Sequence, residues 1–439
     1  MIGNPPYGIS IKGDYRTKVV DHLGKVPDFE IYYYFIECAY KLLGENGIKS
    51  YIIPNTFLFN VFASEYRKKL IKIWNIKCLI DCTAFKIFEG ATIYNAITVF
   101  IKDERNTQKV GYKITKNAES FCDVISRENT YSSKEDFLEN NQNWGLVFKL
   151  SSLVLRITSK IRKIGVKLDE LFPEYSQGLI AYDKYQGQSK EIIESRAYHY
   201  TSKERASLKK WLWGEDVTRY SVKWNEKEWI DYCDGIANPR QPKFFKGKRL
   251  LLREITNPSI FCAYTEEELC HDPAIIVVLG KSKTELMMLL GLLNSKLASF
   301  YHFNSSPKAT KGAFPKILVE DIKIFPVKVT SEKLIYSIVS EYLCLVSSSS
   351  SLLSFFDRLM DAMVYELYFP EEIKTADAEV LKHLTNLPEL KDNWSDEKKL
   401  AVIEKVYKEL SDPAHPVNIA MKKQQQIPEV RIVEGKDKK

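Results

Sequence analysis

The first residues of the chain are of types that could hold a planar base. The chain opens with Gly3-Asn4-Pro5-Pro6-Tyr7. Two consecutive prolines restrict the backbone and lack N–H donors, so the carbonyl groups around them stay available as acceptors. Asn4 adds a side-chain carbonyl acceptor, and Tyr7 adds a flat ring. Acceptors beside an aromatic ring suit the exocyclic amino group of a stacked base. The alternative is a rigid turn after a strand, without chemistry of its own.

The residues that follow predict helices that alternate with buried strands. Apolar residues at helical spacing predict helices over 28–45 and 61–74. Near-continuous apolar runs predict strands at 48–53, 76–82 and 94–102. Strands of this kind between helices indicate an α/β fold with a mostly parallel sheet that is covered on both faces. The segment before Asn4 is shorter than the ~5–6 residues of an ordinary strand, so we expect a partial sheet whose first strands are missing.

The rest of the chain divides by composition and pattern. Turn signals among short strand patterns predict a mixed α+β domain in the middle, with one clear helix over 283–302. A polar and charged end is typical of disorder. We therefore expect an α/β domain over 1–110, a connector over 111–144, the mixed domain over 145–330, a helical region over 331–420 and a disordered tail over 421–439.

Positive charge is concentrated in the middle of the chain. Residues 145–330 hold 30 Lys+Arg and 21 Asp+Glu, a net of +9, which leaves 34 basic and 36 acidic residues, a net of −2, for the remainder of the +7 chain. Such a field with interleaved aromatic residues suits a polyanion, although a solvated basic face is the alternative. The candidate phosphate contacts are Arg240, Lys243, Lys246, Lys248, Arg249, Arg253, Lys308, Lys311 and Lys316.

Several other classes of protein are disfavoured by the sequence. The eight cysteines form no C-x-x-C pair, and the six histidines form no H-E-x-x-H motif, so we expect no metal site. Buried thiols in a reducing cytoplasm are the favoured interpretation of the cysteines. No apolar run approaches the ~20 residues of a membrane span, and the first residues lack the pattern of a secretory signal. We expect a cytoplasmic protein without a membrane partner.

The opening motif resembles motif IV of the amino-methyltransferases, specifically the gamma class of adenine-N6 DNA methyltransferases. Residues 35–43 resemble the motif V helix of that family, 43–54 its motif VI, and 88–97 its motif VIII. The middle is similar to the target-recognition domain of Taq-type methyltransferases and type IIG restriction–modification enzymes. The similar stretches are 177–179, 214–220, 250–254, 292–296 and 314–317, in that order, and the helical residues 361–369 are also family-like.

The resemblance implies a site in which an adenine is flipped out of duplex DNA. Asn4 and the Pro5 carbonyl, in the Pro5-Pro6 turn, would accept hydrogen bonds from its amino group. Tyr7 and Phe88 would sandwich the ring, with Phe85 as the second candidate for Phe88. The cofactor of the complete enzyme would be S-adenosylmethionine, but G-x-G occurs nowhere in the chain. We therefore expect no appreciable cofactor binding by this chain alone, and an upstream polypeptide that supplies the cofactor-binding half.

The favoured interpretation is a partial site-specific adenine-N6 DNA methyltransferase of a restriction–modification system, inactive by itself. One alternative is a non-catalytic DNA-binding specificity module in which the opening motif is a relic. Another is a methyltransferase that acts on protein glutamine or on RNA, because such enzymes also use Asn-Pro-Pro-Tyr. The long basic region after motif VIII disfavours that second alternative.

Overall fold

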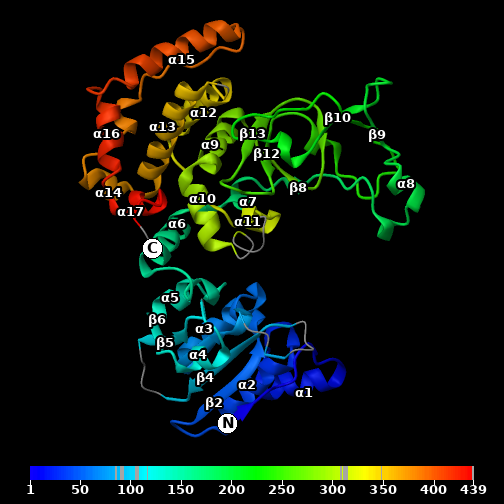
Figure 1. The fold of residues 1–439 in the computed structure, drawn as a ribbon, viewed down its shortest axis with the longest axis vertical. Coiled ribbons are helices and arrows are strands. Elements are labelled where there is room, and N and C mark those ends of the chain that lie inside the picture. The colour runs from blue at the N-terminus through cyan, green and yellow to red at the C-terminus, as the bar shows by residue number, and fades with distance from the viewer. Residues whose placement is uncertain are drawn as a thin grey trace. The chain divides into compact units, whose positions relative to one another are not determined.

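The chain folds into two compact units of mixed α/β structure. A computed structural model describes residues 1–84, 87–88, 93–103, 108–115, 117–306, 309, 315–347 and 349–437 (Figure 1). The first unit comprises residues 1–159, and the second comprises the residues from 160 onward. Strands and helices occur in both units, which agrees with the predicted mixed α/β class.

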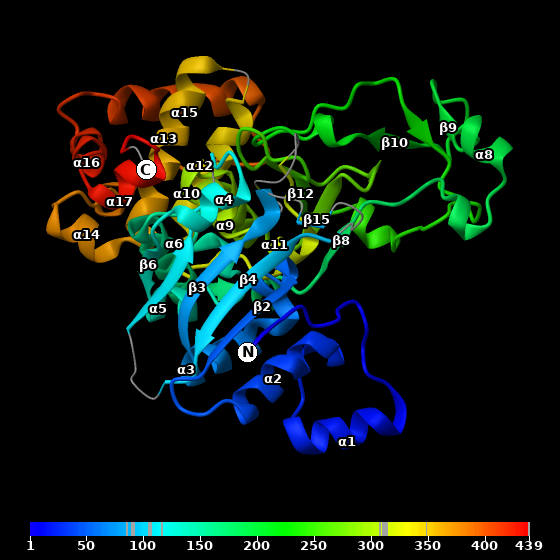
Figure 2. The same ribbon diagram turned by 60° about the horizontal axis from the view of Figure 1, so that its bottom comes forward.

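A six-stranded sheet forms the centre of the first unit, and Figure 2 shows β2, β4 and β3 side by side. The predicted strands at 48–53, 76–82 and 94–102 are confirmed to within one or two residues. In spatial order the strands are β1 (Ile2–Gly3), β2 (Ile48–Pro54), β4 (Asn95–Ile101), β3 (Asn75–Asp81), β5 (Lys109–Lys113) and β6 (Thr130–Ser133).

The expectation of a mostly parallel sheet is wrong. Strands β1, β2, β3 and β5 run in one direction, but β4 lies between β2 and β3 and pairs antiparallel with both. Strand β6 is likewise antiparallel to β5. The reason is that β3 and β4 are neighbours in the sequence and in the sheet, so they pair antiparallel in the manner of a hairpin.

The helices of the first unit are α1 (Gly13–Leu23), α2 (Ile31–Leu42), α3 (Ser64–Ile73), α4 (Phe121–Ser126) and α5 (Lys134–Glu139). Helix α2 is shorter than the predicted 28–45 for local reasons. Asp28 and Phe29 have φ values of 49° and 52°, and Leu43 is extended. The apolar face of α2 is buried in the core of the unit, where Tyr33 and Ile36 lie.

Residues 111–144, expected to be a connector, are part of the first unit. They supply most of β5 and all of β6, α4 and α5. Arg67 in α3 is fully buried and explains how their end is held. Its guanidinium donates to the backbone carbonyls of Asn141 at 2.6 Å and Gln142 at 2.9 Å, and to those of Phe57 at 2.8 Å and Asn60 at 2.9 Å. One arginine thus joins two loops that lie far apart in the sequence.

The strands of the second unit form three sheets. One has the order β13 (Cys262–Thr265), β12 (Arg249–Arg253), β15 (Ile275–Leu279) and β8 (Tyr175–Gln177), and its paired strands are antiparallel. The second sheet has the order β14 (Leu269–His271), β10 (Lys209–Leu212), β11 (Trp229–Ile230) and β9 (His199–Tyr200). Strands β16 (Pro326–Val327) and β7 (Val166–Lys167) form the third.

The helix predicted over 283–302 is two helices. Helix α9 (Lys283–Asn294) ends where Ser295 adopts an extended backbone, and α10 (Lys296–Ser305) begins directly after it. The Ser295 hydroxyl donates to the Leu292 carbonyl at 2.7 Å and accepts from the Ala298 N–H at 3.1 Å. The same side chain therefore closes one helix and caps the next.

The remaining helices of the second unit confirm the prediction that 331–420 is helical. They are α12 (Lys333–Leu345), α13 (Ser350–Tyr368), α14 (Pro370–Thr375), α15 (Asp396–Leu410), α16 (Pro416–Gln424) and α17 (Pro428–Val433), with the shorter α7 (Leu168–Leu171), α8 (Lys190–Glu194) and α11 (Val319–Lys323) earlier in the chain. Helix α6 (Ser152–Ile164) spans the residue at which the two units divide. The prediction of disorder over 421–439 is wrong for the described part, because Val430 and Val433 bury their side chains.

Candidate functional site

Polar residues gather at one edge of the six-stranded sheet. Because β1, β2 and β3 run in the same direction and β4 runs against them, the ends of the first three strands lie at the edge where β4 begins. Asn4 follows β1, Asn55 follows β2, Asp81 ends β3 and Asn95 begins β4. The topology therefore places the opening motif among three other polar side chains.

Tyr7 is held at this edge by a buried amide. The Asn95 side chain is 1% exposed, and its Nδ2 donates to the Tyr7 hydroxyl at 3.3 Å. The Tyr7 ring is half-buried and packs against the core of the unit. The adjacent Tyr94 carbonyl accepts a hydrogen bond from the Asn55 N–H at 2.9 Å. The ring of Tyr7 is thus fixed to the start of β4 through its hydroxyl.

A carboxylate fixes the backbone that leaves the motif. The Gly8 N–H donates to Glu30 Oε1 at 3.0 Å, and the Ile9 carbonyl accepts from the Ile31 N–H at 3.0 Å. Burial raises the pKa of Glu30, although the bond from Gly8 opposes that shift. Glu30 stands immediately before α2, so the start of this helix positions the turn after Tyr7.

A second set of polar side chains, those of Asn55, Asp81 and Thr83, lies where β2 and β3 end. Asn55 is almost fully buried, and its Nδ2 donates to Thr83 Oγ1 at 2.9 Å. The Thr83 hydroxyl and N–H both donate to the Asp81 carboxylate, the N–H at 3.0 Å. These contacts order the residues that immediately follow both strands.

The structure describes most of the predicted base-binding residues. Asn4 and Pro6 are exposed, and Pro5 is buried. Phe88 is 36% exposed, and Phe85 lies outside the described residues. Within the described part of the chain, the aromatic ring contacts include neither Tyr7 nor Phe88. The role of these residues toward a base stays a prediction.

One predicted phosphate contact is a structural residue. Arg249 is fully buried at the start of β12, and its guanidinium donates to the carbonyls of Gly247 at 2.8 Å and Glu267 at 2.6 Å. Burial lowers its pKa to about 10. Its bonds tie β12 to the loop between β13 and β14, and its burial keeps it from a phosphate at the surface. The expectation for Arg249 is therefore wrong.

The other predicted cations differ in how far they are engaged. Lys243 pairs with Glu174, and Lys316 pairs with Glu254 at 3.2 Å. The Arg240 guanidinium donates to the Asn238 side chain and to backbone carbonyls, and Arg253 lies 5.1 Å from the centroid of the Phe261 ring. Lys246 and Lys248 are exposed and have no ion pair within the described residues. Lys308 and Lys311 lie outside the described residues.

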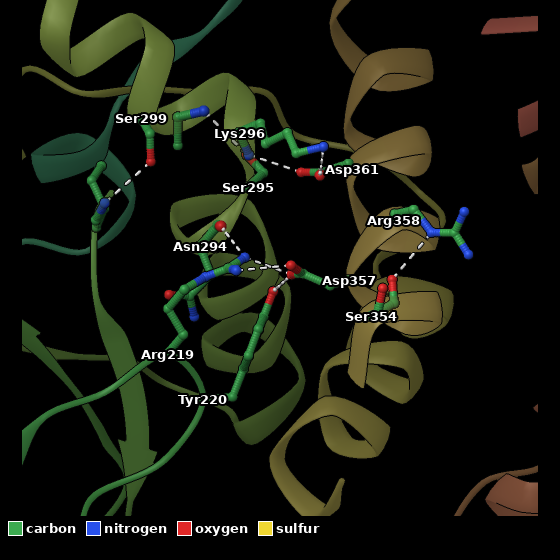
Figure 3. Close-up of polar contacts among 12 residues, drawn as sticks. Arg219, Tyr220, Asn294, Ser295, Lys296, Ser299, Ser354, Asp357, Arg358 and Asp361 are labelled. Atoms are coloured by element: carbon green, nitrogen blue, oxygen red, sulfur yellow. Dashed lines mark hydrogen bonds and ion pairs between the residues drawn. The ribbon is translucent and has the colours of Figure 1, made fainter. Parts of the chain in front are cut away.

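A partly buried ion pair connects the middle of the chain to helix α13 (Figure 3). The Arg219 guanidinium donates to both carboxylate oxygens of Asp357, at 2.8 and 2.5 Å, and to the Asn294 carbonyl at 2.7 Å. The Tyr220 hydroxyl donates to the same carboxylate at 2.9 Å. The Asn294 side chain exchanges two hydrogen bonds with the Cys262 backbone, at 3.0 and 2.8 Å. The part of 145–330 that belongs to the second unit is therefore packed against the helical region after it.

A second ion cluster extends this contact to helix α17. The Lys296 N–H donates to Asp361 at 2.8 Å, and Lys296 Nζ lies 3.6 Å from the same carboxylate (Figure 3). Lys296 Nζ also lies 3.2 Å from Glu434, which directly follows α17. Burial, and then the repulsion of Asp357, raise the pKa of Asp361 to about 7. The break at Ser295 makes this cluster possible, because it exposes the first N–H groups of α10 to the Asp361 carboxylate.

Sequence reasoning missed the residues that hold Tyr7. Asn95 stands inside the stretch that resembles motif VIII, but no role was predicted for it, and Glu30 was not singled out. A usable signal for Asn95 is a polar residue within a fully apolar strand, because such a residue needs a partner when it is buried. Glu30 carries no comparable signal, since its partner is a backbone N–H.

Residues 1–12, around β1, lack the two features that we expect of an S-adenosylmethionine site. Binding of this cofactor needs a glycine-rich turn and an acid for the ribose. Residues 1–12 contain no Asp or Glu, and Gly3 and Gly8 are too far apart to form that turn. Among the described residues, no three His, Cys, Asp or Glu side chains gather as a metal-binding group would. None of the described helices is long and apolar enough to cross a membrane.

Comparison with known proteins identifies the class to which these features belong. Residues 1–88 match the family model of the Eco57I restriction-modification methylase, and residues 209–327 match that of the TaqI-like C-terminal specificity domain. The first segment of the chain is thus similar to restriction-modification methylases, and its middle is similar to a DNA-specificity domain. More particularly, a segment similar to part of the Eco57I methylase precedes a segment similar to the TaqI-like C-terminal specificity domain.

Two relatives are named as combined restriction enzymes and methyltransferases. A protein of Methanocaldococcus jannaschii that is named as a type II restriction enzyme and methyltransferase is 25% identical over 85% of this chain and 31% of its own length. The Escherichia coli type II restriction enzyme and methyltransferase RM.Eco57I is 24% identical over 38% of this chain and 17% of its own length. The chain therefore spans less than a third of either relative. The structure of the type IIL restriction-modification enzyme MmeI in complex with DNA aligns with 93% of this chain and 56% of that protein, at 10% identity and a TM-score of 0.48.

Proposed function

We propose that the chain carries the base-binding and DNA-recognition parts of a site-specific adenine-N6 DNA methyltransferase of a restriction–modification system. The observation that carries this proposal is the position of Asn4-Pro5-Pro6-Tyr7. The motif leaves β1 at the polar edge of the sheet, and Asn95 fixes its aromatic ring. The proposal covers a complete enzyme, of which this chain is one part.

The chemistry of the site is orientation of the target base. An adenine flipped out of the duplex enters the site, where the Asn4 side-chain carbonyl and the Pro5 carbonyl accept hydrogen bonds from its amino group. The rings of Tyr7 and Phe88 stack on its two faces, with stacking worth ~1–3 kcal/mol per base. S-adenosylmethionine supplies the methyl group in the complete enzyme. The chain's own contribution is to hold the amino nitrogen in one orientation, which requires no nucleophilic side chain.

The hydrogen bonds around Tyr7 support this role. Asn95 holds the hydroxyl, and Glu30 holds the N–H of the next residue, so the ring has little freedom to turn. A ring that is already fixed loses little conformational entropy when a base stacks on it, because the ordering took place during folding. Pre-organisation of this kind suits a site whose task is to orient a base.

Duplex DNA is the proposed partner of the second unit. Its specificity domain lies within the segment of net charge +9. Lys246 and Lys248 are the cations best placed for phosphates, because they are exposed and form no ion pair within the described residues. Arg240, Arg253 and Lys316 are partly engaged within the chain and are secondary candidates.

The cofactor-binding half is proposed to come from an upstream polypeptide. We expect calorimetric titration of the purified chain with S-adenosylmethionine to show no micromolar binding, since the glycine turn and the ribose acid are not among residues 1–12. Micromolar binding would contradict this part of the proposal and would leave the roles of Asn4 and Tyr7 unaffected.

The proposed activity is tested by expressing the chain together with the coding sequence upstream of its first codon in a host without adenine methylation. The expected result is N6-methyladenine at one sequence motif, detected by long-read sequencing and lost in Asn4→Ala. Asn393→Ala, an exposed asparagine of the second unit, is the matched control and should retain methylation. DNA binding without any adenine methylation would instead favour the non-catalytic specificity module. Methylation that survives Asn4→Ala would contradict the proposed base contact.

A further inference from the structure

An exposed aromatic ring stands at the tip of a loop in the second unit. Tyr185 lies between β8 and α8, and it is 83% exposed. Figure 1 shows α8 and β9 at the end of an arm that extends away from the helices α12 and α13 of the same unit. Other aromatic residues of this arm pack on one another. The rings of Tyr182 and Tyr198 are stacked at 5.5 Å, and those of Trp211 and Trp213 meet edge to face at 5.6 Å.

The loop that carries Tyr185 is held by its own hydrogen bonds. The Asp183 carboxylate accepts the Tyr185 N–H at 2.8 Å. The Gln188 side chain accepts the Asp183 N–H at 2.9 Å and donates to the carbonyls of Ala181 at 3.0 Å and Gly235 at 2.7 Å. Gly187 closes the turn with a φ of 82°, a conformation that favours glycine. None of these contacts involves the Tyr185 ring, so the fold of the loop does not require an aromatic residue at its tip.

The neighbouring side chain gives the tip a positive charge. Lys184 Nζ lies 4.8 Å from the centroid of the Tyr185 ring. Lys184 forms no ion pair with a carboxylate of the described residues, whereas Arg196 and Arg205 of the same arm pair with Glu228 and Asp231 at 3.2 and 2.6 Å. The tip therefore presents a flat ring beside a cation that forms no ion pair within the described residues, although the Asp183 carboxylate lies in the same turn; the loop is within the segment of net charge +9.

From this arrangement we propose that Tyr185 is a base-contacting residue of the DNA-recognition surface. Its ring stacks on a base that is exposed when the target duplex is distorted, and Lys184 meets the adjacent phosphate. A flat face accepts any base, and the cation suits the backbone next to it. The inference rests on the proposed binding of DNA by the second unit. It adds a contact outside residues 209–327, to which the specificity-family match is confined.

The test is equilibrium binding of fluorescent duplex DNA to the full chain at several salt concentrations. The variants are Tyr185→Ala, Tyr185→Phe and Lys184→Ala, with Tyr131→Ala as the control, because Tyr131 is a half-exposed tyrosine of the first unit. We expect Tyr185→Ala to bind about tenfold more weakly with an unchanged salt slope, as the loss of one stacked base implies. Tyr185→Phe should bind within twofold of the wild type, and Lys184→Ala should lower the salt slope by about one unit.

The possible outcomes separate this inference from the proposed function. If the wild-type chain binds DNA and Tyr185→Ala binds within twofold of it, the inference alone is overturned. Equal losses in Tyr185→Phe and Tyr185→Ala would show that the hydroxyl, not the ring face, makes the contact, which also overturns it. If the wild-type chain binds no duplex, DNA recognition by the second unit fails, and the inference fails with it. Thermal melting of each variant verifies that the exposed substitution leaves the fold intact.

Discussion

Arg219 and Asp357, which are 138 residues apart in the sequence, form a two-bonded ion pair. Arg219 belongs to the middle of the chain, and Asp357 belongs to helix α13. The pair is only partly accessible to water, with side-chain exposures of 30% and 19%. Hydrogen bonds between charged groups with two parallel donors are among the strongest in proteins. This relationship makes the helical region a structural part of the specificity domain.

Asp357→Asn is expected to destabilise the second unit by about 2–3 kcal/mol. The substitution removes the charge partner of Arg219 and weakens the bond from the Tyr220 hydroxyl. Urea denaturation followed by circular dichroism measures the change. Arg358→Ala is the matched control on the same helix, because Arg358 is exposed and its guanidinium donates to the Ser354 carbonyl of its own helix at 3.3 Å. Equal effects of the two substitutions would mean that the ion pair contributes no particular stability.

The contribution of Asp361 to the stability of the second unit should fall as the pH rises from about 4 to about 7. This contribution is opposite in sign to those of His199, His271 and His302, whose pKa values are lowered by burial. Burial and the repulsion of Asp357 raise the pKa of Asp361 from 3.8 to about 7, so the folded state holds a proton that the unfolded state has released. Burial raises the pKa of Asp272 to about 7 as well, which adds a slope of the same sign. Below about pH 4 both states are protonated, and the stabilisation is fully present.

Asp361→Asn should remove this contribution, so the stability of the variant relative to the wild type should rise between about pH 4 and about pH 7. Removing one titrating group changes the slope by at most about 1.4 kcal/mol per pH unit between pH 4 and 7, and the Asp272 contribution remains. The measurement is the urea midpoint of wild type and variant at pH 5 and pH 7.5. Asp392→Asn is the control, since that carboxylate is 97% exposed. A variant whose stability changes with pH by the same amount as that of the wild type would show that Asp361 is ionised throughout.

Arg67→Ala is expected to cost the first unit at least about 3 kcal/mol. The substitution leaves four backbone carbonyls of two loops without their donor, and each unsatisfied buried acceptor costs ~1–3 kcal/mol. Amide hydrogen exchange should show faster opening at residues 57–60 and 141–142. Lys68→Ala, which removes an exposed pair with Glu65 on the same helix, should change neither quantity. Unchanged exchange at 141–142 in Arg67→Ala would refute the proposed connection.

Lys246→Glu combined with Lys248→Glu should weaken binding to duplex DNA on all sequences alike. Both side chains are exposed, so the fold should be unaffected, and the salt slope should fall by about one unit for each lost phosphate contact. Arg249→Ala should instead lower the melting temperature and leave the salt slope of DNA binding unchanged. The reason is that its guanidinium stabilises the sheet around β12 and carries no charge at the surface. Comparison of melting and DNA binding for these variants separates the two roles. A stable Arg249→Ala protein with weakened binding would restore the surface role that its burial contradicts.

Periodicity and turn chemistry were sufficient for the elements whose pattern is local. The strands β2, β3 and β4 could be predicted from apolar runs, and the opening motif could be recognised from its rare combination of residues. The antiparallel insertion of β4 did not follow, because the direction of a strand depends on the neighbours it pairs with and leaves no mark on its composition.

Residues whose role depends on distant partners were predicted least well. Arg249 and Lys248 are adjacent in a basic segment, yet one is buried and the other exposed. Strand β12 begins at Arg249, and Arg249 is buried together with the next three residues of the strand, whereas Lys248 precedes the strand. The mostly polar composition of residues 111–144 predicts a connector. Phe137 and Trp144 within this range are nevertheless fully buried in the core of the first unit. The role of Asn95 could not be predicted without the position of Tyr7, whose hydroxyl accepts a hydrogen bond from Asn95.

The contact of Lys296 with Glu434 has a practical consequence for engineering. A chimera that exchanges only residues 145–330 to obtain a new sequence preference would separate two ion pairs. Arg219 would lose its native partner Asp357, and Lys296 would lose Glu434 after the last helix. The transplanted module would arrive with cations that have lost their partners. The smallest segment that can be exchanged with its contacts intact is therefore the whole second unit through helix α17. A purification tag fused directly after Glu434 would disturb the contact between Glu434 and Lys296.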